Sequence, residues 1–265
     1  MSICFTNKVT GSLLYQHKVD VCPSTSYFGS HTHGVYEMLY IINGDVTHIV
    51  EDKKYKLNSG DLVFIRPNMY HFIQIDSSEK DYERINIQFD EHDINTDLSI
   101  IPPYVNVVNT GSNARLFDIF DKINTYASTF EEDVFYKILK GLLTEIVYNI
   151  SISDSIDERE ETSNINPIMT QALGYINDNL FTIKNVGEIA DAIFVTESYL
   201  FKLFKKELRK GPKKYINDKR LLAAQQMIKH GEKPTLIFEK CGFNDYTSFY
   251  RGYVDYFGHS PSQEI

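Results

Sequence analysis

The chain has 265 residues, a net charge of −9, and 42% hydrophobic against 24% charged residues, which is ordinary for a globular protein and long enough for two domains with separate cores. It contains no apolar run of about eighteen residues, and its N-terminus lacks a signal-peptide layout. We therefore expect a cytoplasmic protein without membrane contact. Cys4, Cys22 and Cys241 are too widely spaced for a disulfide framework or a zinc site.

Residues 11 to 90 have the pattern of short β-strands. Four runs are rich in β-branched and aromatic residues and are separated by turn residues: Tyr36 to Ile42, Thr47 to Val50, Leu62 to Ile65 and Ile85 to Phe89. Asn43-Gly44 is the strongest hairpin signal, because both residues tolerate positive φ. Short strands at this spacing predict a small barrel or jelly roll over residues 1 to 111.

A set of polar residues falls inside this predicted barrel. In chain order the set is His31, His33, Glu37, Gly44, Gly60-Asp61, Pro67 and His71. Over about residues 25 to 90, this spacing resembles the cupin pattern. On a strand, residues 31, 33 and 37 would point to one face. We therefore expect two imidazoles and a carboxylate to converge in the barrel, with His71 arriving from another strand.

Three uses of this cluster stay open. The side chains can be polar ligands for a small effector, they can hold a metal ion such as iron, manganese or zinc, or they can only satisfy hydrogen bonds. Arg66 can pair with an anionic or hydroxyl-rich ligand, or it can form a surface salt bridge. The candidate ligand-binding residues are His31, His33, Glu37, Arg66 and His71. No bound metal and no other cofactor is predicted.

The apolar residues change to helical spacing over residues 112 to 150. They are Leu116, Phe117, Phe120 and Ile123, then Val134, Phe135, Ile138, Leu142, Leu143, Ile146, Val147 and Ile150. Two helices fit this pattern, with Ser128 to Asp133 as the break. The second is apolar over a wide face, so it can meet a second subunit or pack wholly within the chain. Residues 151 to 165 are acidic and poor in apolar residues, which predicts a flexible linker.

Residues 166 to 265 contain two segments of similar layout, Ile189 to Lys206 and Ile237 to Tyr253. Each has a short amphipathic run, a turn, a polar residue and a longer amphipathic run, which is the pattern of a helix-turn-helix used twice. One face of each longer run is apolar and is expected to be core: Leu200, Leu203 and Phe204, then Phe249, Tyr253 and Tyr256. The opposite faces are the candidate DNA-binding residues: Ser198, Phe201, Lys202, Lys205 and Lys206, then Tyr246, Thr247, Tyr250 and Arg251.

Polar residues predict where these helices begin. Asn185 to Glu188 is a capping-box signature for the first short helix, and Thr235 is expected to cap its counterpart. Thr196 and Asn244 are expected to cap the longer helices. Between the modules, Pro212 to His230 predicts one helix, which would be roughly 28 Å long at about 1.5 Å per residue. Adjacent major-groove segments on one DNA face are about 34 Å apart, so this helix could hold two DNA-reading helices near that separation.

The charge distribution favours DNA as a partner in spite of the acidic total. Residues 165 to 265 hold 14 Lys and Arg against 11 Asp and Glu, a net of +3. Residues 1 to 164 have a net of −12. A mildly basic half can attract phosphate locally while the acidic half keeps the chain in solution. A solvated helix face would show similar charges, so the two helix-turn-helix motifs indicate DNA binding more strongly than the charge does.

The C-terminal motifs resemble the AraC/XylS transcription regulators over about residues 167 to 265. They are Tyr199-Leu200, Leu203 to Glu207, Tyr215-Ile216, Lys219 to Leu221, Ala224, Gly242-Phe243, Asp245, Phe249 to Arg251, Tyr256 to Gly258 and Ser260 to Ser262. The sequence departs from the family at four places. Arg209 replaces a usual Gly, Phe238 a small Ala, Phe201 a polar base-reading residue, and Val254-Asp255 two lysines that commonly contact phosphate.

This resemblance implies an α+β protein: a cupin-like sensor barrel, a helical dimer element, a linker, and an all-α double helix-turn-helix domain. It also implies a transcription regulator that binds promoter half-sites in double-stranded DNA as a homodimer and responds to a small, sugar-like metabolite. No acid–base or nucleophile–base constellation occurs outside the cupin cluster, so we do not expect an enzyme. The alternative is a metal-dependent cupin enzyme whose helical half is an interaction module.

Overall fold

The computed structural model describes residues 2–24, 31–109, 114–153, 162–164 and 166–264. It divides into two compact units, the first formed by Met1–Gly29 and Val35–Ser163, the second by Ser30–Gly34 and Asn164–Ile265. The helices predicted over residues 112 to 150 are part of the first unit and not a separate body. The linker predicted over residues 151 to 165 contains a strand, β10 (Thr162–Asn164), and residues 154 to 161 of it lie outside the described residues.

The first unit contains two β-sheets. One has six strands, in the order β1 (Ser2–Thr10), β2 (Leu13–Asp20), β8 (Tyr82–Phe89), β3 (Tyr36–Asn43), β6 (Asp61–Ile65) and β9 (Val107–Asn109). The other has four, in the order β10, β5 (Lys53–Leu57), β4 (Val46–Val50) and β7 (His71–Ile75). The four strands expected from the sequence are present, and the two sheets agree with the small barrel or jelly roll that they predict.

The predicted hairpin at Asn43-Gly44 is wrong. Strand β3, which ends at Asn43, pairs with β6 and β8, whereas the next strand, β4, pairs with β5 and β7. Asn43-Gly44 therefore carries the chain from one sheet to the other. The tight hairpin is the next turn, where Val50 pairs with Lys53 and Glu51 has a φ of +52°.

Alternation along β3 divides the core into two layers. Met38 and Tyr40 join a cluster on one face of the six-stranded sheet, and Leu39 and Ile41 join a second cluster with residues of the four-stranded sheet. This is the period of two that strands impose on side chains. Because both faces of β3 are covered, its residues 37 to 41 are all buried.

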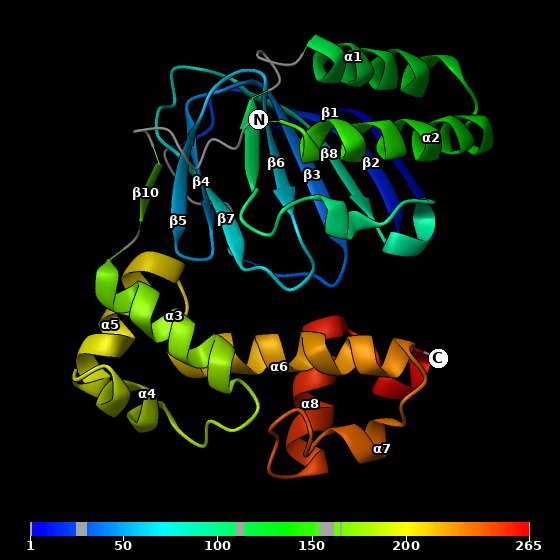
Figure 1. Ribbon diagram of the computed structural model, residues 1–265. Coiled ribbons are helices and arrows are strands. Elements are labelled where there is room, and N and C mark those ends of the chain that lie inside the picture. The colour runs from blue at the N-terminus through cyan, green and yellow to red at the C-terminus, as the bar shows by residue number, and fades with distance from the viewer. Residues whose placement is uncertain (1, 25–30, 110–113, 154–161, 165, 265) are drawn as a thin grey trace. The chain divides into compact units, whose positions relative to one another are not determined.

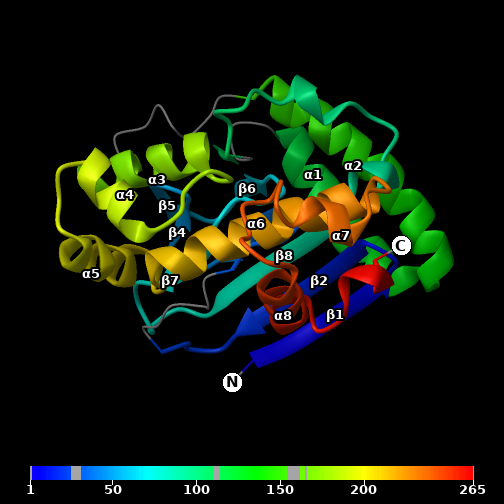
Figure 2. The ribbon, with the colours of Figure 1, turned by 90° about the horizontal axis from the view of Figure 1, so that it is seen from below.

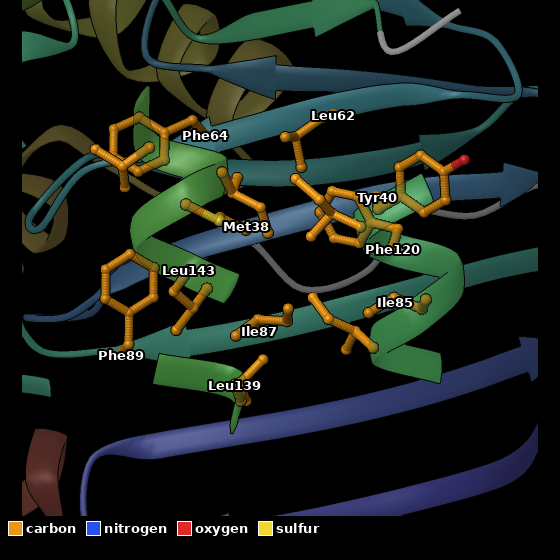
Figure 3. Packing of buried hydrophobic residues seen from close by; sticks show 14 of the residues in the cluster. Met38, Tyr40, Leu62, Phe64, Ile85, Ile87, Phe89, Phe120, Leu139 and Leu143 are labelled. Carbon is orange, nitrogen blue, oxygen red and sulfur yellow. The ribbon is translucent and has the colours of Figure 1, made fainter. Parts of the chain in front are cut away.

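Helices α1 (Ala114–Thr129) and α2 (Glu132–Ser151) cover the outer face of the six-stranded sheet, next to two short 3-10 helices, η1 (Glu91–Asp93) and η2 (Leu98–Ile100) (Figure 1). Phe120 of α1 stacks on Tyr40 with ring centroids 4.4 Å apart. Leu139 and Leu143 of α2 enter the same cluster (Figure 3). These helices pack against the sheet as their apolar spacing predicts.

The second unit is helical and is organised along α6 (Pro212–Lys229). At one end of α6 lie α3 (Pro167–Asn179), α4 (Val186–Ala192) and α5 (Glu197–Leu208); at the other lie α7 (Pro234–Ile237) and α8 (Tyr246–Phe257), followed by η5 (Pro261–Gln263) (Figure 2). The described part of the chain has no helix long and apolar enough to span a bilayer. The α+β class expected from the sequence is confirmed.

Candidate functional site

The first helix-turn-helix module begins at the residues that the sequence indicates. The side chain of Asn185 accepts a hydrogen bond from the backbone N–H of Glu188 at 3.1 Å, and Thr196 accepts one from that of Tyr199 at 3.2 Å. The carboxylate of Glu188 accepts from the backbone N–H of Lys184. Both caps satisfy N–H groups that have no partner within their helix, so α4 and α5 have fixed starting points.

The second module is capped at different residues from those predicted. Asp245, and not Asn244, caps α8, its carboxylate accepting from the backbone N–H of Ser248 at 2.7 Å. Thr235 lies inside α7 because Pro234, whose ring fixes φ, takes the first helical position after Lys233. Either neighbouring Asx residue can cap a helix, so the sequence alone did not distinguish Asn244 from Asp245.

The two longer helices, α5 and α8, have the two faces that their periodicity predicts. Leu200, Leu203 and Phe204 of α5, and Phe249 and Tyr253 of α8, are buried. All nine candidate DNA-binding residues are exposed: Ser198, Phe201, Lys202, Lys205, Lys206, Tyr246, Thr247, Tyr250 and Arg251. Two polar or aromatic exposed faces on capped helices are what insertion into a major groove requires.

Tyr256 differs from its prediction as a core residue, because it is only partly buried. Its hydroxyl donates to the backbone carbonyl of Thr32 at 2.9 Å and lies 2.6 Å from the Thr32 hydroxyl. Gln226 of α6 donates to the carbonyl of Gly34 at 2.8 Å. These contacts join Thr32 and Gly34 to the helices of the second unit.

Arg220 of α6 ties the two modules together. Its guanidinium is buried and donates to the carbonyls of Leu180 and Ile183, next to the first module, at 2.8 and 2.6 Å. It also donates to the carbonyl of Gly242 in the turn of the second module at 2.7 Å. Gly242 has a φ of +79°, and a Cβ there would lie 2.6 Å from the Phe181 carbonyl oxygen. Sequence reasoning did not identify this role, because a charged residue in a helix is normally taken to be exposed.

A groove of about 590 Å³ lies beside α5, the start of α6 and α8. Phe201, Lys205, Lys213 and Lys214 line it together with acidic Asp218 and further residues. The ammonium of Lys210 lies 2.6 Å from the Asp218 carboxylate, and that of Lys214 lies 3.6 Å from it. Asp218 therefore offsets part of the positive charge that the sequence places here.

In the first unit, two of the predicted ligand residues meet between the sheets. The Nε2 atom of His71 lies 3.0 Å from the Glu37 carboxylate, and both side chains are buried. The Nδ1 atom of His71 lies 2.9 Å from the Met69 carbonyl and must carry a hydrogen to bond it. This pair can donate to or accept from a bound hydroxyl group.

His48 lies near this pair, although it is not among the predicted ligand residues. It is buried on β4, and its ring centroid lies 5.9 Å from that of His71. Val46 and Val50, which share its face of β4, belong to the cluster between the sheets. A histidine between two apolar residues at this period is the signal that could have identified it.

Arg66 is placed differently from its prediction as an effector ligand. Its guanidinium stacks over Phe64, on the helix-covered face of the sheet, with its carbon 5.1 Å from the ring centroid. It donates to the carbonyls of Pro102 and Val105 at 2.7 and 2.9 Å. These contacts fix the segment before β9, which explains the position of Arg66 without a ligand.

His31 and His33 precede the strand that the sequence reading assigned to them. Strand β3 begins at Tyr36, so the parity argument that aligned residues 31, 33 and 37 on one strand is wrong. The two imidazole centroids lie 5.8 Å apart. His31 and His33 belong to the second unit and Glu37 and His71 to the first, so each pair is described within its own unit.

Two family models match the chain in the order of its two units. A model described as an AraC-like ligand binding domain matches residues 15–139, and a helix-turn-helix domain model matches residues 189–264. The Msm operon regulatory protein of Streptococcus mutans is 24% identical over 250 residues, covering 91% of this chain and 88% of that protein. The transcriptional activator RhaS of Pectobacterium carotovorum is 22% identical over 251 residues, covering 90% and 88%.

A third relative, the lactose operon transcription activator of Staphylococcus xylosus, is 31% identical over 102 residues, or 37% of this chain and 36% of that protein. The family models and these relatives are of regulators and not of enzymes, so the cupin-enzyme alternative is not supported. A ligand-binding unit thus precedes a DNA-binding unit with two capped helix-turn-helix modules. The chain belongs to the AraC/XylS family and is a ligand-responsive transcription regulator.

Proposed function

We propose that α5 and α8 enter adjacent major-groove segments of a promoter half-site. The observation that carries this proposal is the pair of exposed faces on α5 and α8, held to one another through α6 and the three carbonyl contacts of Arg220. Helix α6 has 18 residues, which at about 1.5 Å per residue is roughly 27 Å. That length is near the separation of about 34 Å between groove segments on one side of DNA.

Selection of fragments from a random DNA pool by the purified full-length protein tests this proposal. We expect an enriched site with two short conserved blocks about one helical turn apart. Lys202→Ala and Arg251→Ala should each weaken binding by about 1–3 kcal/mol and relax preference in a different block. Lys229→Ala, at an exposed position in the last turn of α6, is the matched control. Equal weakening on all DNA sequences would instead mark a residue as a phosphate contact.

The effector that we propose is a small polyhydroxylated metabolite, such as a sugar, bound by the buried pair Glu37 and His71. Buried carboxylate and imidazole groups can orient the hydroxyl groups of a bound molecule by hydrogen bonding. The Staphylococcus xylosus relative is named for the lactose operon, which supports testing sugars first. In this proposal the bound metabolite shifts the population of conformations that can occupy paired half-sites.

A thermal-shift screen against sugars and related metabolites tests the effector proposal. A ligand that binds only the folded chain raises the melting temperature, by an amount set by its concentration and affinity. Glu37→Gln and His71→Asn should abolish the shift, whereas His92→Asn, at an exposed histidine of η1, should keep it. Stoichiometric metal in the purified protein, lost in Glu37→Gln, would favour a metal site instead.

We also propose a cytoplasmic homodimer that pairs through α1 and α2. Phe117 on α1 and Tyr148 on α2 are 55% and 56% exposed, and large apolar side chains in the open favour an interface. Sedimentation of the full-length protein should report a dimer that Tyr148→Glu converts to a monomer. Lys137→Glu, an exposed change on the same helix, should leave the dimer intact. A monomeric parent protein would refute the proposal.

A further inference from the structure

Phe201 is an exposed aromatic residue in the middle of the reading face of α5. Its side chain is 50% exposed, with Ser198 three positions before it, Lys202 next to it and Lys205 four positions after it on the same side of the helix. A single exposed apolar side chain is common on protein surfaces, so the contacts and neighbours of this ring decide what it can bind.

The ring of Phe201 is held in place by its surroundings. A Cβ built on Gly211, at the start of α6, would lie 2.9 Å from its Cε2 atom, so the ring rests against that backbone. The ammonium of Lys205 lies 5.7 Å from the ring centroid. Because the ring is restrained on these sides, it loses little conformational freedom on binding. Its exposed part is available to a molecule that binds this face of α5.

The rest of α5 offers few ways to read base edges by paired hydrogen bonds. Its twelve residues include no Arg, Asn or Gln, so Lys202, Lys205 and Lys206 are its only side chains of the types that bind guanine or adenine with two hydrogen bonds. A phenyl ring cannot donate to or accept from a base edge in this way. The one apolar group that DNA presents in the major groove is the C5 methyl group of thymine.

We propose that Phe201 selects a T·A base pair by packing against the thymine C5 methyl group. This inference rests on the proposed insertion of α5 into the major groove and adds the base that the helix prefers. Removing one methyl from water is worth about 0.8 kcal/mol, or about fourfold in affinity. Lys205, four positions after Phe201 on the same side of α5, would hold a neighbouring phosphate and fix the register of the ring.

Deoxyuridine scanning of the selected DNA site tests this contact, because deoxyuridine lacks only the methyl group of thymidine. Each thymine in the α5 half of the site is replaced in turn, and binding is measured with the full-length protein. At one position we expect about fourfold weaker binding. Phe201→Ala should bind the two DNAs equally at that position, whereas Phe201→Leu, which keeps an apolar side chain, should retain part of the difference.

Lys202→Ala is the control, because it should weaken binding while leaving the deoxyuridine effect unchanged. An unchanged melting temperature shows that Phe201→Ala remains folded. Indifference of the parent protein to deoxyuridine throughout the α5 half would overturn the inference, as would an equal deoxyuridine effect in Phe201→Ala. Failure to enrich any DNA sequence would refute the DNA-binding proposal itself, so the two failures are distinct.

Discussion

Replacing Arg220 with methionine should uncouple the two helix-turn-helix modules. The guanidinium is 7% exposed and donates to three carbonyls, those of Leu180, Ile183 and Gly242. Methionine has an unbranched side chain that can fill much of the same space, but it has no donor. The substitution therefore removes the hydrogen bonds between α6 and both modules while changing packing little.

The magnitude follows from two opposing effects. A hydrogen bond from a charged donor contributes about 1.5–3 kcal/mol, so three contribute roughly 4.5–9 kcal/mol. Burial opposes this, since it lowers the pKa of Arg220, and removing such an ion from water costs several kcal/mol. Methionine avoids that cost. We expect the free energy of unfolding of the second unit to fall by about 3 kcal/mol.

Urea denaturation of the full-length protein measures this loss. The transition of the second unit is identified as the one that DNA shifts to higher urea concentration, because DNA binds its folded state. Lys229→Met, an exposed change in the same helix, should stay within about 0.5 kcal/mol of the parent protein. The Arg220→Met protein should also protect only one block of the selected DNA site, whereas the parent protein protects two. A loss below about 1 kcal/mol, with both blocks still protected, would refute this reasoning.

Three further predictions concern the second unit. Gly242→Ala should lower the free energy of unfolding by about 2–4 kcal/mol in the same urea assay, because the new Cβ would lie 2.6 Å from a carbonyl oxygen and the backbone φ is +79°. Gly252→Ala, where the nearest atom to the new Cβ is a side-chain atom 3.6 Å away, should change the free energy of unfolding little. Arg209 ends α5 with a φ of +60°, a backbone conformation that costs glycine less than other residues. Arg209→Gly should therefore raise the free energy of unfolding by up to about 1 kcal/mol and raise the melting temperature. A lower melting temperature would contradict this prediction. Burial raises the pKa of Cys241 from 9.0 to about 11. The stability that the buried, protonated thiol contributes is complete below pH 9 and is lost as pH rises towards 11, so urea titrations should show about 1 kcal/mol lost between pH 8 and 10. Cys241→Ala should not show that part of the loss.

The elements with a local signal were predictable from the sequence. Apolar residues at helical spacing placed Leu200, Leu203 and Phe204 in the core and Lys202 at the surface, because every turn of a helix repeats the same two faces. The cap of α8 was predictable to within one residue, Asp245 in place of Asn244, but that of α7 was not, because its N-cap is Lys233 and not Thr235. The Glu37 and His71 pair was also predictable. Polar residues inside apolar strands are few, and buried polar groups need hydrogen-bond partners.

The features that depend on distant partners were not predictable. Asn43-Gly44 reports that the chain turns, but the identity of the sheet that receives the next strand depends on residues far along the chain. Strand β1 is mostly exposed, and its pairing with β2, rather than an apolar face, defines it. Arg220 and Arg66 are held by carbonyls of other segments. No local pattern distinguishes such arginines from solvated ones.

The acidic total of the chain limits how it can recognise DNA. Exposed charges are screened beyond about 8–10 Å at physiological salt, so the net charge of −12 over residues 1 to 164 acts weakly at a distance. Close to α5, however, Asp218 already pairs with Lys210 and Lys214, which leaves fewer cations for phosphates. A protein with few phosphate contacts gains less affinity from non-specific attraction and depends more on contacts with the bases. The composition of the exposed faces of α5 and α8, more than charge, should therefore decide which promoters the chain occupies.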